Sequence, residues 1–100
     1  MATENRIEPL LRRMREMQAI SEQGTEAVGM EAFEAAEEEV DRAFETACAM
    51  RPQSTDEARA LLEVLLTWWG DWGGLPCTRG YDLAALRNVH ACLASGMVTP

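Results

Sequence analysis

The sequence predicts an all-α protein, a small antiparallel bundle of about four helices. Apolar residues return at every third or fourth position through four segments, which is the spacing of one helix face. No run alternates between apolar and polar residues over more than a few positions, so no strand is predicted. With 100 residues, 47% of them hydrophobic, the chain can build one core. We therefore expect residues 1–100 to form a single domain.

The first half of the chain predicts two helices joined by a polar linker. The first covers about residues 7–21, and Pro9 fits its first turn, where a missing N–H leaves no hydrogen bond unmade. Gly24 marks a hinge-like connection. The second helix covers about residues 30–50 and ends before Pro52, because a proline drives the preceding residue out of helical geometry.

The third helix is expected at residues 55–69 and is predicted to be the central element of the bundle. Ser54 and Glu57 form a capping-box pattern, in which Ser54 accepts from the Glu57 amide and the Glu57 carboxylate returns to the Ser54 amide. A broad apolar face follows, and Gly70 ends the helix. The glycine-rich residues 70–81 are predicted to form a loop.

The fourth helix is expected at residues 82–95, with Asp82 as its N-terminal cap and its end before Gly96. A variant of this architecture has a three-helix core, with helix 7–21 docked on a second subunit. The apolar stripe expected to face the core consists of Leu83, Leu86, Val89, His90 and Leu93.

The charge of the chain argues against nucleic acid as its partner. The net charge is −8, and 12 of the 17 acidic residues lie in residues 1–50. Binding to phosphate requires a basic face that releases counterions, and no such face is predicted. Mimicry of nucleic acid by helix 30–50 is a minor alternative that rests on charge alone.

The composition also predicts the cellular compartment of the protein. The three cysteines cannot all pair within one chain, and no basic start followed by an apolar run marks a secretion signal. No apolar stretch approaches the roughly 18 residues of a membrane span. We therefore expect a cytoplasmic protein with no membrane partner.

No residue pattern predicts an enzyme, a cofactor or a metal site. The chain has no lysine, which excludes Schiff-base chemistry and the lysine-containing phosphate loop. His90 is the only histidine, so a Cys77 or serine nucleophile with Asp71 or Asp82 lacks a supporting signature. A zinc quartet would join His90 to the three cysteines, Cys48, Cys77 and Cys92, but their spacing lacks the close pairs of zinc sites.

Three tryptophans within five residues are the least ordinary feature of the sequence. Trp68 and Trp72 share one helix face, whereas Trp69 continues the apolar face of its helix. Together with Tyr81 they either cover the core or form an aromatic anchor for a partner protein. These four residues are our predicted partner-binding site.

A second predicted surface is the acidic face of helix 30–50. Its glutamates could in principle bind a metal, but a solvated or partner-facing surface fits such a run better. The arginines of the first helix have the opposite sign and could pair with it, within the chain or between subunits. The acidic face consists of Glu31, Glu34, Glu38 and Asp41, and the arginines are Arg6, Arg12, Arg13 and Arg15.

Residues 37–70 resemble a group of small uncharacterised bacterial all-helical proteins. The resemblance rests on Asp41-Arg42-Ala43 and on the cap Pro52-Gln53-Ser54-Thr55 between two helices. Where that group often has a lysine after the alanine of the third helix, this chain has Leu61 or Leu62. The resemblance implies a helical fold and no particular function.

Taken together, the sequence predicts a non-enzymatic module that binds a protein partner or a second copy of itself. The binding surface would be the tryptophan end or the acidic helix. The alternative is a small-ligand or metal-binding protein with a pocket beneath residues 70–81, where glycines let a ligand approach the backbone.

Overall fold

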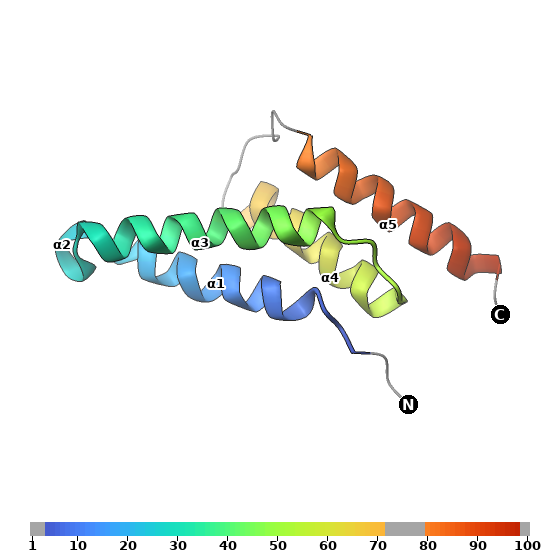
Figure 1. Ribbon diagram of the computed structural model, residues 1–100, viewed down its shortest axis with the longest axis horizontal. Coiled ribbons are helices and arrows are strands. Elements are labelled where there is room, and N and C mark those ends of the chain that lie inside the picture. The colour runs from blue at the N-terminus through green and yellow to red at the C-terminus, as the bar shows by residue number, and fades with distance from the viewer. Residues whose placement is uncertain (1–3, 72–79, 99–100) are drawn as a thin grey trace.

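A computed structural model describes residues 4–71 and 80–98, and in this part of the chain it contains helices and no strand (Figure 1). The long helices run alternately in opposite directions along the chain (Figure 1). The predicted all-α bundle is confirmed. The helices are α1 (Glu8–Glu22), α2 (Thr25–Val28), α3 (Met30–Ala49), α4 (Thr55–Leu66), a π-helical turn η1 (Thr67–Asp71) and α5 (Tyr81–Val98).

α1 begins where the sequence predicts, with Pro9 in its first turn. The Asn5 side chain prepares this start, since its Oδ1 accepts hydrogen bonds from the Ile7 and Glu8 amides at 3.1 and 2.9 Å. α1 then packs antiparallel against α3 of its own chain (Figure 1). The structure therefore differs from the variant in which this helix docks on a second subunit.

The predicted linker between the first two helices contains a helix of its own. α2 forms one short turn between Gly24 and Gly29, whose φ angles are 84° and 90°. Residues with a Cβ rarely adopt these angles, so the two glycines permit the reversals on either side of α2. The predicted linker is therefore partly helical.

At the start of α4, one of the two hydrogen bonds of the predicted capping box is present. Ser54 is extended, and its Oγ accepts a hydrogen bond from the Glu57 amide at 3.1 Å. The Glu57 carboxylate instead accepts from the Gln53 amide, at 2.8 Å, and turns toward Arg6. The predicted return to the Ser54 amide is therefore wrong.

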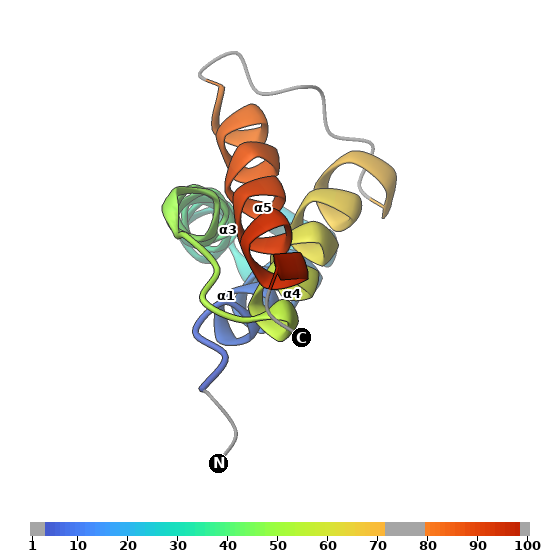
Figure 2. The same cartoon turned by 90° about the vertical axis from the view of Figure 1, so that its right-hand side faces the viewer.

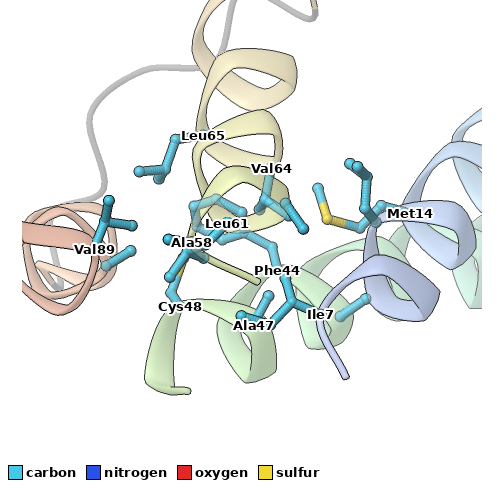
Figure 3. Close-up of a cluster of buried hydrophobic side chains, with 14 residues drawn as sticks. Ile7, Met14, Phe44, Ala47, Cys48, Ala58, Leu61, Val64, Leu65 and Val89 are labelled. Atoms are coloured by element: carbon cyan, nitrogen blue, oxygen red, sulfur yellow. The ribbon is translucent and has the colours of Figure 1, made fainter. Parts of the chain in front are cut away.

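The core lies where α1, α3, α4 and α5 meet (Figure 3). The predicted central helix does occupy the middle, because α4 contacts α1, α3 and α5. α3 is equally central, since it contacts α1, α2, α4 and α5. The largest fully buried apolar side chains are Phe44, Ile7, Met14, Leu61, Leu65, Val64 and Cys48.

α4 and α5 differ from the prediction at their ends. α4 ends at Leu66, which is 64% exposed, and the chain continues into the π-helical turn η1. α5 begins after Gly80, whose carbonyl accepts from the Ala84 amide, so Asp82 lies inside the first turn. Gly96 does not end the helix. The remainder of the predicted loop, residues 72–79, lies outside the described residues.

α5 lies over α3 and α4 and makes no contact with α1 (Figure 2). On the face toward the core, its buried apolar residues are Ala85 and Val89, and Tyr81, Cys92 and Leu93 are partly buried and also pack against the core. Asn88 fixes this face to the end of α3, because its Nδ2 donates to the Cys48 and Met50 carbonyls at 3.3 and 3.2 Å.

Candidate functional site

The described members of the tryptophan cluster turn toward the core. Trp68 and Trp69 lie on η1, and both are half-buried against the core cluster. The Trp68 ring stacks on Phe44 of α3, with ring centroids 4.3 Å apart and an interplanar angle of 21°. Tyr81, at the start of α5, also packs against the core. Trp72 lies outside the described residues.

The Trp69 indole has one unusual feature. Its Nε1 is buried and meets no acceptor within residues 4–71 and 80–98, although the side chain as a whole is half-buried. A buried N–H without a partner destabilises the fold by about 1–3 kcal/mol. The stacking of Trp68 on Phe44 packs η1 against α3, and the role of the tryptophan cluster in partner binding stays a prediction.

The acidic face of α3 is exposed as the sequence predicts. Glu31, Glu34, Glu38 and Asp41 all face solvent and follow one side of the helix. Partial burial, and then the charge of Glu45 one turn away, raise the pKa of Asp41 above its ordinary value. The stripe concentrates negative charge along the helix.

One arginine of α1 pairs with α3 inside the same chain. Arg13 Nη2 lies 2.6 Å from Glu39 Oε2 on α3. The other arginines turn elsewhere: Arg12 pairs with Glu8 of its own helix at 3.4 Å, and Arg15 donates to Thr67 at 3.5 Å. The predicted basic patch therefore does not face the acidic stripe as a unit.

The fourth arginine, Arg6, belongs to the most buried polar cluster of the described chain. Glu57 has no exposed side-chain surface. Its Oε2 accepts from the Arg6 amide and from Arg6 Nε at 2.7 and 2.9 Å, and its Oε1 accepts from Arg6 Nη2 at 3.0 Å. These bonds lower the pKa of Glu57 from 4.5 to about 2, the guanidinium contact being the largest cause.

This cluster ties the N-terminal segment to the connection between α3 and α4. Arg6 Nη2 also donates to the Arg51 carbonyl at 2.9 Å, and Asn5 Nδ2 donates to the Asp56 carbonyl at 3.3 Å. The polar groups that meet here are satisfied by one another. The cluster is therefore a structural clamp rather than a site for a substrate.

The described members of the residues considered for zinc or nucleophilic chemistry do not gather into a site. His90 is exposed on α5, whereas Cys48 is buried in the core and Cys92 donates to the Ser54 carbonyl, with Sγ at 3.6 Å from the oxygen. Asp82 lies eight residues before His90 on the same helix, about 12 Å along its axis. Within the described ranges, no three His, Cys, Asp or Glu side chains are placed to share a metal ion. Cys77 lies outside them.

A shallow groove of about 390 Å³ runs between α1 and α4. Three arginines and three acids line it over a floor of Leu11 and Ala60, so its formal charges cancel. This balance gives the groove no preference for a charged ligand. The lining charges are Arg12, Arg15, Arg59, Glu8, Asp56 and Glu63.

The outer face of α5 is the surface that sequence reasoning misplaced. Of the stripe expected to face the core, Val89 is buried and Leu93 is half-buried, but Leu83 and Leu86 are 50% and 38% exposed, and His90 is exposed. The expected orientation is therefore right for Val89 and Leu93 and wrong for Leu83, Leu86 and His90. Apolar residues occur on both sides of this helix, and the chain buries the side with small side chains, which allows close packing on α3 and α4.

No helix within residues 4–71 and 80–98 combines the length and apolar character that a membrane crossing requires. Comparison with known proteins adds no relative from which a function could be transferred. The resemblance of residues 37–70 to small bacterial helical proteins therefore stays a prediction. No protein-family model, no curated protein and no solved structure matches the chain.

Proposed function

We propose that the chain is a non-enzymatic protein-interaction module that binds its partner through the outer face of α5. The observation that carries the proposal is that α5 has two apolar sides, of which its own chain covers one. An apolar patch that remains exposed on a folded chain can serve as a binding surface for a partner. The outer face, as we use the term, consists of Leu83, Ala84, Leu86, Arg87, His90, Ala91 and Ala94.

The helical geometry explains why the leucines cannot turn inward. Successive residues are about 100° apart around a helix, so Leu83 lies about 200° from Ala85. Asn88 holds the Ala85 and Val89 side against α3 through its two carbonyl contacts. A rotation of α5 that buried Leu83 would break these hydrogen bonds.

Burial of the two leucines gives a partner a source of binding energy. Full burial of a leucine side chain contributes about 1.5–3 kcal/mol, and each of these two is already partly covered. Arg87 and His90 are the polar side chains of this face, and Arg87 adds a positive charge. Arginine is one of the residues enriched in protein interfaces.

The proposal places the protein in the cytoplasm. The chain has three cysteines, an odd total, so they cannot all form disulfides within one chain. Disulfides are rare in reducing compartments, so free thiols are expected there.

Site-specific crosslinking in the native host tests the proposal. A photoreactive amino acid replaces Leu86, and a matched control places it at Glu34 on the acidic face of α3, which is also exposed. We expect one discrete crosslinked product from position 86, with a partner peptide that mass spectrometry identifies. A failure to crosslink at position 86, or equal products from both positions, would contradict the proposal.

A further inference from the structure

We infer that the occupant of the outer face of α5 is a second copy of this chain, in a two-fold dimer whose α5 helices run antiparallel. The inference rests on the proposed function, because it names the partner of the same surface. Two properties of the face support it: its charge and its self-complementary shape.

The charge distribution makes α5 the surface at which two copies can meet. Each copy carries a net charge of −8, so most contacts between copies bring carboxylates together. The outer face carries Arg87 and no exposed acid. Asp82, the acid within α5, is buried and accepts a hydrogen bond from the Leu83 amide. Contact through this face also keeps the two acidic stripes of α3 outside the interface.

The order of side chains along α5 suits an antiparallel pairing. The large side chains, Leu83 and Leu86, lie toward the N-terminal end of the face, and the small ones, Ala91 and Ala94, lie toward its C-terminal end. A two-fold axis across the middle of the helix places the leucines of each copy against the alanines of the other. Large side chains then meet small ones, which lets the two helices approach closely.

The position of α5 in the fold leaves room for such a pairing. α5 contacts α3 and α4 on one side and does not touch α1, so no described helix of its own chain lies over the outer face (Figure 2). From Leu83 to Ala94 the face extends about 16 Å along the helix. A two-fold interface uses the same surface on both copies, so one such face is sufficient.

Analytical ultracentrifugation of the full chain tests the inference. We expect the mass to rise from 11.1 kDa toward twice this value between roughly 10 µM and 1 mM protein, a range suited to a small interface. Leu86→Glu should weaken dimerisation by about 100-fold or more, because it buries an unpaired carboxylate. Ala94→Glu should act in the same way from the other end of the face.

Met30→Glu is the matched control, because Met30 is 58% exposed and begins α3, far from α5 (Figure 1). It makes the same change in charge and should leave dimerisation within about twofold. A far-ultraviolet spectrum shows that each variant keeps its helices. Higher salt should tighten the wild-type dimer several-fold, since it screens the repulsion between two chains of charge −8.

A monomer at 1 mM, or a dimer that survives both Leu86→Glu and Ala94→Glu, would overturn the inference. Crosslinking distinguishes this failure from a failure of the proposed function. A product between position 86 and a different protein, with a monomer in the ultracentrifuge, rejects the second copy and keeps the interaction module. The absence of any product from position 86, with a monomer in the ultracentrifuge, rejects both.

Discussion

Glu57 connects the start of α4 and the residues just before it with Arg6, which lies 51 positions away in the sequence. Its amide donates to Ser54 and starts α4, while its carboxylate holds Arg6 and the Gln53 amide. A buried carboxylate without such partners would destabilise the fold strongly. The clamp therefore keeps the N-terminal segment in the position from which Ile7 reaches the core.

Replacement of this carboxylate should lower the stability of the protein in a pH-dependent way. Glu57→Gln removes the ion pair with Arg6 and places an amide NH₂ next to the N–H donors of Arg6 and Gln53. The free energy of unfolding at pH 7 should therefore fall by about 3 kcal/mol. The pKa of Glu57 is about 2 in the fold, against an ordinary value of 4.5. A lowered pKa stabilises the fold above pH 4.5, and this contribution is lost as the pH falls toward 2.

Urea unfolding at pH 7, 4.5 and 2.5 measures the effect. The difference between wild type and Glu57→Gln should shrink toward pH 2.5, while the other carboxylates titrate in both proteins. Glu63→Gln on the same helix is the control, because Glu63 is exposed, and should change stability by less than about 0.5 kcal/mol. Equal losses from the two variants would show that the clamp does not stabilise the fold.

Long-range pairs of this kind explain part of what the sequence could not predict. Arg6 and Glu57 are 51 positions apart, and neither helical periodicity nor the capping box indicates that they meet. The capping box did predict that Ser54 and Glu57 interact, which was half of the local geometry. Likewise, the sequence does not indicate that Asn88 contacts the end of α3, because a single asparagine on a helix is common.

At the scale of elements, periodicity predicted the four long helices well, and it failed where a segment has two apolar sides. For α3, acids and apolar residues alternate around the helix, so the buried side was clear. For α5, apolar residues occur around most of the helix, so the predicted stripe grouped Leu83 and Leu86 with Val89, although only Val89 of these three is buried. The chain instead buries the side that packs closely, so the candidate surface was missed.

The short helix α2 depends on its flanking glycines. Gly29 has a φ of 90° and a ψ of 152°, a region that residues with a Cβ rarely enter, while a Cβ there would meet no atom within 4 Å. Gly29→Ala should therefore destabilise the protein through backbone strain alone, by about 1–3 kcal/mol.

Gly70 provides the matched comparison for this prediction. It also has open space around an added Cβ, but it lies in η1 without a positive φ. Gly70→Ala should be neutral or stabilise the protein by up to about 1 kcal/mol, since alanine restricts the unfolded chain. Thermal unfolding of both variants measures the difference. Equal effects would mean that α2 does not hold Gly29 in this geometry.

The whole molecule is an elongated helical bundle, 53 × 33 × 18 Å along its principal axes. Its acidic stripe lies on α3, and its acid-free apolar surface lies on α5. In the dimer that we propose, the acidic stripes of α3 disfavour most contacts between copies, and the outer face of α5 is the surface through which two copies associate. This division of the surface is the physical basis of the function that we propose.

The most direct test of this account is an isotope-filtered nuclear Overhauser experiment on a mixture of ¹³C-labelled and unlabelled chains. It detects contacts between copies and none within a copy. We predict intermolecular signals from the methyl groups of Leu83 and Leu86 to those of Ala91 and Ala94. Intermolecular signals confined to α1 or α3, or none at a concentration of about 1 mM, would contradict the account.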